Sequence, residues 1–183
     1  MKRVLALVLI VAFICILGTI YAGEKNFQYV GASKCKMCHK SEKSGNQYGL
    51  WMERKHSKAY ATLATAESKE VAQKAGVTGD PQKAKECLVC HVTAFEASDA
   101  QKAETLTLEE GVSCEACHGP GSEYKGMKVM KGIYAKTMKG ADYGLIAPSE
   151  EVCVKCHNTK SPTYQKFEYA KAVKIVSHPV PKK

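Results

Sequence analysis

Cysteine and histidine recur in one five-residue pattern, C-x-x-C-H, at residues 35–39, 87–91, 114–118 and 153–157. Two thiols at this spacing can form thioethers with the two vinyl groups of one porphyrin, and the adjacent histidine then lies beneath the iron as an axial ligand. The pattern predicts four covalent haem c groups. Their predicted attachment residues are Cys35, Cys38, Cys87, Cys90, Cys114, Cys117, Cys153 and Cys156, and their predicted proximal iron ligands are His39, His91, His118 and His157.

Paired thiols have two other common uses. Four C-x-x-C pairs can form two zinc sites of four thiolates each, and a single pair can be a thioredoxin-like redox dithiol. Neither chemistry requires a histidine directly after every pair, and histidine fills only 6 of the 183 positions. Four such histidines by chance would be an improbable coincidence, so haem attachment is the favoured interpretation.

The remaining histidines limit how the irons are coordinated. Besides the proximal four, the chain has His56 and His178, so at most two haems can have two histidine ligands from one chain. We predict that both are iron ligands. For the third motif we predict a methionine sulfur opposite His118, from Met130 rather than Met127, because both follow that motif closely.

The first 22 residues have the layout of a secretory signal peptide. A short basic segment at 1–3 precedes an almost wholly apolar run at 4–20, and Ala22 closes it before a polar chain. We predict a signal peptide at 1–22 and one tetrahaem domain at 23–183. An uncleaved membrane anchor is the alternative, because the run is long enough to span a bilayer. Either way the domain is expected in the periplasm or at the cell surface, where c-type haem is attached.

The basic composition does not indicate nucleic-acid binding. Residues 23–183 carry 25 Lys and Arg against 18 Asp and Glu, a formal charge of +7. The two propionates of each of four haems would bring the total to about −1. All but one of these basic residues are lysines scattered along the chain, the exception being Arg54. We therefore expect no nucleic-acid partner, and contact with a membrane only if the N-terminal run is retained.

Helical patterns dominate between the motifs. Apolar and ligand-capable residues recur at helical spacing in 47–63, 122–134 and 164–176, and turn signals lie at 78–81 and 119–121. Successive motifs start 52, 27 and 39 residues apart, which argues against a regular repeat. The predicted fold class is mostly α, with short helices and long loops wrapped around four covalently attached haems. About one haem per forty residues leaves little room for a conventional core.

In these features the chain resembles the tetrahaem cytochrome c-554 family of multihaem c-type cytochromes. The resemblance covers nearly all of 23–183 and rests on the segments 34–40, 87–92, 111–121 and 152–157, on Trp51 with 56–59, and on a helix leading to His178. It implies that His56 ligates the fourth-motif haem, that His178 ligates the first-motif haem, and that the haem of His91 is five-coordinate. It also implies haems packed in near-contact pairs. Family members carry a histidine soon after 119–121, where this chain has Met-Lys-Val-Met at 127–130.

Three functions are consistent with these observations. The leading hypothesis is a tetrahaem c-type cytochrome that passes electrons between a donor and an acceptor redox protein outside the cytoplasm, without bond chemistry of its own. The second is a reductase of nitric oxide or a similar small molecule at the five-coordinate haem of His91. The third is a filament subunit that stacks haem against haem and takes a missing ligand from its neighbour, although this chain has no histidine to spare.

Overall fold

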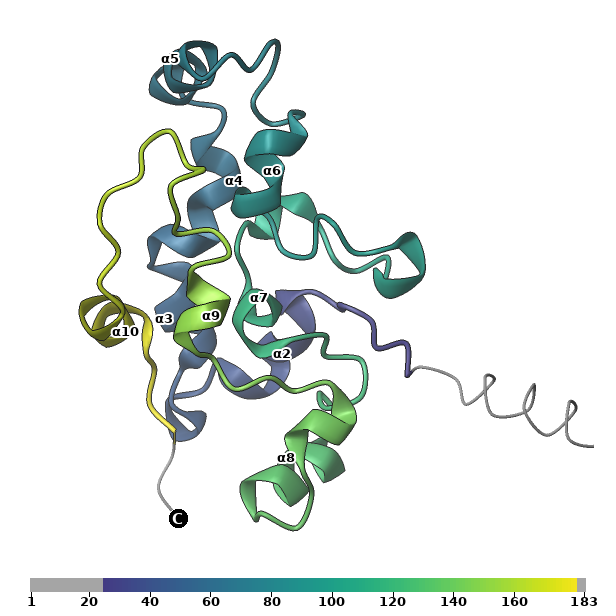
Figure 1. The fold of residues 1–183 in the computed structure, drawn as a ribbon. Coiled ribbons are helices and arrows are strands. Elements are labelled where there is room, and N and C mark those ends of the chain that lie inside the picture. The colour runs from purple at the N-terminus through teal and green to yellow at the C-terminus, as the bar shows by residue number, and fades with distance from the viewer. Residues whose placement is uncertain (1–24, 181–183) are drawn as a thin grey trace, which may run out of the picture.

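The computed structural model describes residues 25–180, which form short helices joined by long loops (Figure 1). The α-helices are α2 (Ala32–His39), α3 (Gln47–Met52), α4 (Ala59–Thr62), α5 (Ala66–Lys74), α6 (Lys85–His91), α7 (Cys114–His118), α8 (Met127–Tyr134), α9 (Glu150–Cys153) and α10 (Tyr169–Val176). The 3₁₀ helices are η1 (Glu42–Ser44), η2 (Lys55–Lys58), η3 (Asp99–Gln101), η4 (Leu108–Glu110) and η5 (Gly140–Tyr143).

The mostly α fold class is confirmed. Residues 25–180 contain no β-strand, and their extended pairing is a bridge between Tyr29 and Lys102. Within this range no helix is both long and apolar enough to cross a membrane. The signal peptide predicted at 1–22 lies outside the described residues.

The helix expected over 47–63 is broken into α3, η2 and α4. Arg54 has extended backbone angles at the break, and the Ser57 hydroxyl donates to the Met52 and Arg54 carbonyls. The His56 carbonyl accepts hydrogen bonds from the Ala59 amide, which closes the 3₁₀ turn of η2, and from the distant Val112 amide at 3.0 Å. Tertiary hydrogen bonds have therefore overridden the helical periodicity of this segment.

The other expected helices form but begin later than the pattern indicated. The segments 122–134 and 164–176 become helical only at Met127 and Tyr169, because the residues that precede these helices, Gly126 and Glu168, are extended. The expected turn at 78–81 is present, with the Asp80 carboxylate accepting from the Gln82 amide. The break at 119–121 is also present, since Gly119 ends α7 with a φ of 77°.

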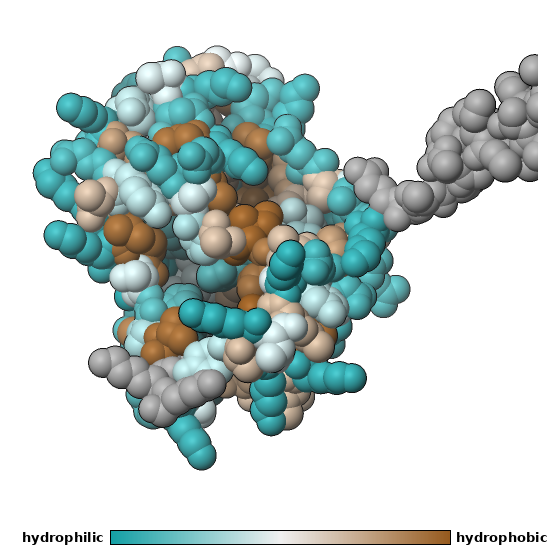
Figure 2. Space-filling model, turned by 60° about the horizontal axis from the view of Figure 1, so that its bottom comes forward, coloured by the Kyte–Doolittle hydropathy of each residue, from teal (hydrophilic) through white to brown (hydrophobic). Residues whose placement is uncertain are grey.

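The buried core of the described residues is small. Its buried apolar side chains are Val30, Ala32, Leu63, Ala72, Leu88, Val92 and Tyr124. Several large apolar side chains are instead exposed, among them Met37 at 85%, Ile175 at 69% and Met127 at 63%. Figure 2 shows apolar side chains gathered in hollows between polar ridges on one face. A chain of this size ordinarily buries more apolar surface, so these residues suit a fold completed by large apolar groups.

Candidate functional site

Each C-x-x-C-H motif lies on a helical turn. The first three occupy α2, α6 and α7, and the fourth begins at the end of α9. The turn continues beyond α9, because the amides of Cys156 and His157 both donate to the Cys153 carbonyl. Residues three positions apart share one face of a helix, so the two thiols of each motif project to the same side.

The attachment thiols of different motifs lie close together. Cys35 of the first motif shares a hydrogen bond with Cys114 of the third, which raises the pKa of Cys35 and lowers that of Cys114. Burial and the neighbouring Cys90 raise the pKa of Cys156 to about 12, so the second motif adjoins the fourth. Burial and then the nearby Cys153 raise the pKa of Cys117. The four motifs are thus neighbours in the order first, third, fourth, second.

Three of the four motif histidines have hydrogen bonds to their rings, and the fourth, His157, stacks its ring on Phe167. His39 Nδ1 lies 3.1 Å from the Gln47 side-chain oxygen, and His91 Nδ1 lies 2.8 Å from the Ala59 carbonyl. His118 forms a hydrogen bond with the Ile146 backbone. Such bonds commonly fix the tautomer of a metal-binding histidine, and in His39 and His91 they leave Nε2 available for iron.

Two further ring contacts involve the non-proximal histidines. The ring centroids of His56 and His157 are 6.0 Å apart, and those of His118 and His178 are 5.8 Å apart. Two metal–nitrogen bonds of about 2 Å each, extended by the near halves of two imidazole rings, require a centroid separation of about 6 Å. Burial is the first cause that lowers the pKa of His56, His118 and His178, which favours the neutral imidazole that binds metal.

One of these contacts was expected and the other was not. His56 lies against His157, as its helical face and the family resemblance indicated. We expected the His178 ring to lie against His39, but the ring that it contacts is that of His118, with His39 close enough to contribute to lowering the pKa of both. The chain after α10 does return to the first motif, where the Gln47 side-chain amide donates to the Pro179 carbonyl at 2.9 Å. The ring of His178, the residue before Pro179, nevertheless lies against His118.

The same contact corrects the expectation that Met130 lies opposite His118. His178 occupies that position, and Met130 is half-buried on α8. The sequence argument considered only residues close to the third motif, whereas the ring that meets His118 comes from 60 residues further along the chain.

A backbone junction at Gly111 and Val112 positions His56. The Val112 amide donates to the His56 carbonyl at 3.0 Å, and the Val112 carbonyl accepts from the Trp51 indole at 2.9 Å. Gly111 has a φ of 63°, and a Cβ there would lie 2.8 Å from the His56 carbonyl oxygen. The segment before the third motif therefore holds the backbone of His56, whose ring lies against His157 of the fourth motif.

Replacing Gly111 with alanine is expected to displace His56. The strained backbone costs about 1–3 kcal/mol, and the new methyl group must also push the His56 carbonyl aside. Loss of stability should therefore be accompanied by conversion of one low-spin haem to high spin, measured by electron paramagnetic resonance (EPR). Gly76→Ala is the matched control, because Gly76 has a φ of 77° and nothing within 4 Å of its added Cβ. Equal spectra for the two variants would contradict this role of Gly111.

Glu115, between the two cysteines of the third motif, is a site residue that the sequence did not indicate. It is 1% exposed. Its carboxylate accepts hydrogen bonds from the amides of Val30, Gly31 and Gly121, at distances between 2.6 and 3.0 Å. Glu115 therefore holds the backbone that precedes the first motif, at Val30 and Gly31, and the backbone that follows the third motif, at Gly121. Only its unusual place inside the motif distinguishes it in the sequence.

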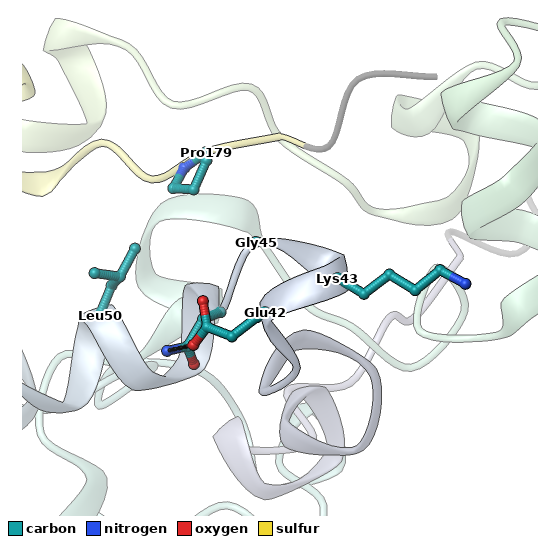
Figure 3. A pocket seen from close by; sticks show the side chains of 6 residues that line it. Glu42, Lys43, Gly45, Leu50 and Pro179 are labelled. Carbon is teal, nitrogen blue, oxygen red and sulfur yellow. Dashed lines mark hydrogen bonds between the residues drawn. The ribbon is translucent and has the colours of Figure 1, made fainter.

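No cluster of metal-binding side chains forms a zinc site within residues 25–180. The described residues contain no group of three or more His, Cys, Asp or Glu side chains placed to hold a bare metal ion. A hollow of about 440 Å³ lies near the chain end, where Leu50 and Pro179 face each other across Gly45 and Lys43 points away (Figure 3). None of its lining residues belongs to a motif.

Comparisons with known proteins identify the family of this chain. The family described as "Cytochrome c554 and c-prime" matches residues 34–119, which span the first three motifs. Cytochrome c-554 of Nitrosomonas europaea is 30% identical over 173 residues, covering 86% of this chain and 69% of that protein. The chain belongs to the cytochrome c-554 family. It is therefore a c-type cytochrome, which supports a role as an electron carrier rather than an enzyme. No solved structure matches this cytochrome c-554 homologue.

Proposed function

We propose that this c-554 cytochrome carries four covalent haems and passes electrons between a donor and an acceptor redox protein. The proposal rests above all on the grouping of the four motifs, in which Cys35 meets Cys114 and Cys90 meets Cys156. Haem c supplies an iron that changes reversibly between ferric and ferrous states. We further propose that residues 1–22 direct export and that 23–183 form the haem domain in the periplasm or at the cell surface.

The two close histidine pairs support a division of the sites into two classes. His56 with His157, and His118 with His178, have the spacing of paired axial ligands. His39 and His91 then have no second histidine, since the described residues include all six histidines of the chain. The two sites with paired histidines belong to the third and fourth motifs, which lie in the middle of the order first, third, fourth, second. The two sites with a single histidine belong to the first and second motifs, at the ends of that order.

This order favours electron entry and exit at the first and second motifs. The first motif has exposed lysines on both sides, at Lys34, Lys36 and Lys40, and its Met37 is 85% exposed. The middle sites retain protein ligands in both oxidation states, which suits transfer without ligand exchange. The single histidine at His91 also favours a second candidate function, reduction of nitric oxide or a similar molecule at that site.

Mass spectrometry and EPR test the haem number and the two classes of site. The mature protein should gain the mass of four haems, and the oxidised form should give two low-spin and two high-spin signals. A reductive titration should consume four electrons per chain. Fewer than four haems would overturn the tetrahaem proposal, and three or four low-spin signals would overturn the ligand assignment. Rapid oxidation of the reduced protein by nitric oxide, with release of a reduced nitrogen product, would favour the reductase.

A further inference from the structure

We propose that Arg54, two residues before His56, is a haem-propionate anchor, an inference that rests on the proposed haem sites. Arg54 is the only arginine within residues 25–180. Its Nη1 atom is buried and has no hydrogen-bond partner. The ion pair found among the described residues, Lys171 with Glu168, does not involve it. A buried cationic nitrogen without a partner is the feature that requires explanation.

The backbone holds Arg54 firmly at this place. Its amide donates to the Trp51 carbonyl at 3.0 Å, and its carbonyl accepts from the Ser57 hydroxyl at 2.8 Å. The positive charge of Arg54 contributes to lowering the pKa of both His56 and His178. The guanidinium therefore lies within electrostatic reach of one ring from each histidine pair.

Arg54 is half-buried, and its buried Nη1 lacks the hydrogen-bond acceptor that a desolvated cationic nitrogen requires. A carboxylate matches it best, because the planar guanidinium can bind both oxygens of one carboxylate. No acidic side chain in residues 25–180 forms an ion pair with Arg54. A porphyrin bound between His56 and His157, or between His118 and His178, would bring two carboxylates of its own.

The charge of Arg54 has a consequence for the haem that it anchors. Reduction adds one negative charge to the site, and a nearby cation stabilises that state relative to the oxidised one. A lysine could replace the charge but not the two-point contact. Arg54 is thus expected to raise the reduction potential of one middle haem above the value that its two histidine ligands would otherwise set.

Redox titration of the holoprotein tests this proposal with Arg54→Gln and Arg54→Lys. In Arg54→Gln, the ratio of reduced to oxidised haem at a fixed potential should fall about tenfold for one low-spin haem, equivalent to about 59 mV. Arg54→Lys should give a smaller fall. Lys58→Gln removes an exposed charge nearby and should change neither low-spin potential. The propionate bands in resonance Raman spectra should shift in both Arg54 variants but not in the control.

Three results separate the possible outcomes. A shift in the reduction potential of one low-spin haem supports the anchor. The haem that supplies the carboxylate is identified by whether the shifted potential belongs to the haem converted to high spin in His56→Ala or in His178→Ala. Four haems with unchanged low-spin potentials and unchanged propionate bands in Arg54→Lys and Arg54→Gln would overturn it. Fewer than four haems in the unsubstituted protein would instead refute the proposed function. If Arg54→Gln fails to fold, Arg54→Lys still decides the question.

Discussion

Replacement of His178 with alanine is expected to convert the third-motif haem from low to high spin. The ring of His178 lies 5.8 Å from that of His118, and its removal leaves this site with one histidine. Half of the low-spin EPR intensity should disappear and be replaced by a high-spin signal. Ser177→Ala changes the exposed preceding residue and should leave the spectrum as it is.

A second substitution distinguishes the third motif from the first. In a Cys35→Ala, Cys38→Ala background the first haem cannot be attached, so any remaining effect of His178→Ala must arise elsewhere. We expect the full low-to-high-spin conversion to persist in that background. If it vanishes, His178 serves His39 and the assignment to His118 falls.

Replacement of Glu115 with alanine is expected to lower the free energy of unfolding by about 3–5 kcal/mol, because three amides lose their buried acceptor. Urea denaturation of the holoprotein, followed by haem absorbance and circular dichroism, measures the change. Glu123→Ala is the control, since Glu123 is an exposed carboxylate eight positions further along. A difference of less than about 1 kcal/mol between the two variants would show that the Glu115 bonds have little net value.

Glu115 should also make stability depend on pH. Burial raises its pKa above the ordinary glutamate value, although the three amides oppose that shift. A group whose pKa is higher in the folded state contributes stability below its unfolded pKa and loses it as pH rises through the folded value. The free energy of unfolding should therefore fall from the acidic range toward neutral pH, less steeply in Glu115→Gln. Identical slopes in urea titrations at several pH values would contradict this.

The parts of the site that follow local rules could be predicted from the sequence. The motif cysteines and their histidines are specified within five residues, and His56 lay on a recognisable helical face. Family membership, confirmed by comparison, was visible in the segments around the motifs. The mostly α fold followed from periodicity, because no segment carries the alternation that a strand requires.

The rest depends on contacts between segments that are distant along the chain. The family resemblance assigned His178 to the first motif, but its ring lies against His118 of α7, an orientation that the sequence of the tail does not specify. The sequence distinguishes Arg54 only as the one arginine among the basic residues of 23–183, and the burial of its Nη1 depends on the fold. The helix expected over 47–63 is interrupted at Arg54, and the His56 carbonyl that follows accepts from the distant Val112 amide as well as from the Ala59 amide.

The two histidine pairs differ in which partner a ribosome makes first. His56 precedes His157 by 101 residues, whereas His178 follows His118 by 60. In a chain exported from its N-terminus, His56 would reach the outside before the fourth motif, whereas His178 would arrive after the third motif. Under the proposed ligand assignment, the fourth motif would then have both of its histidines before the third motif does.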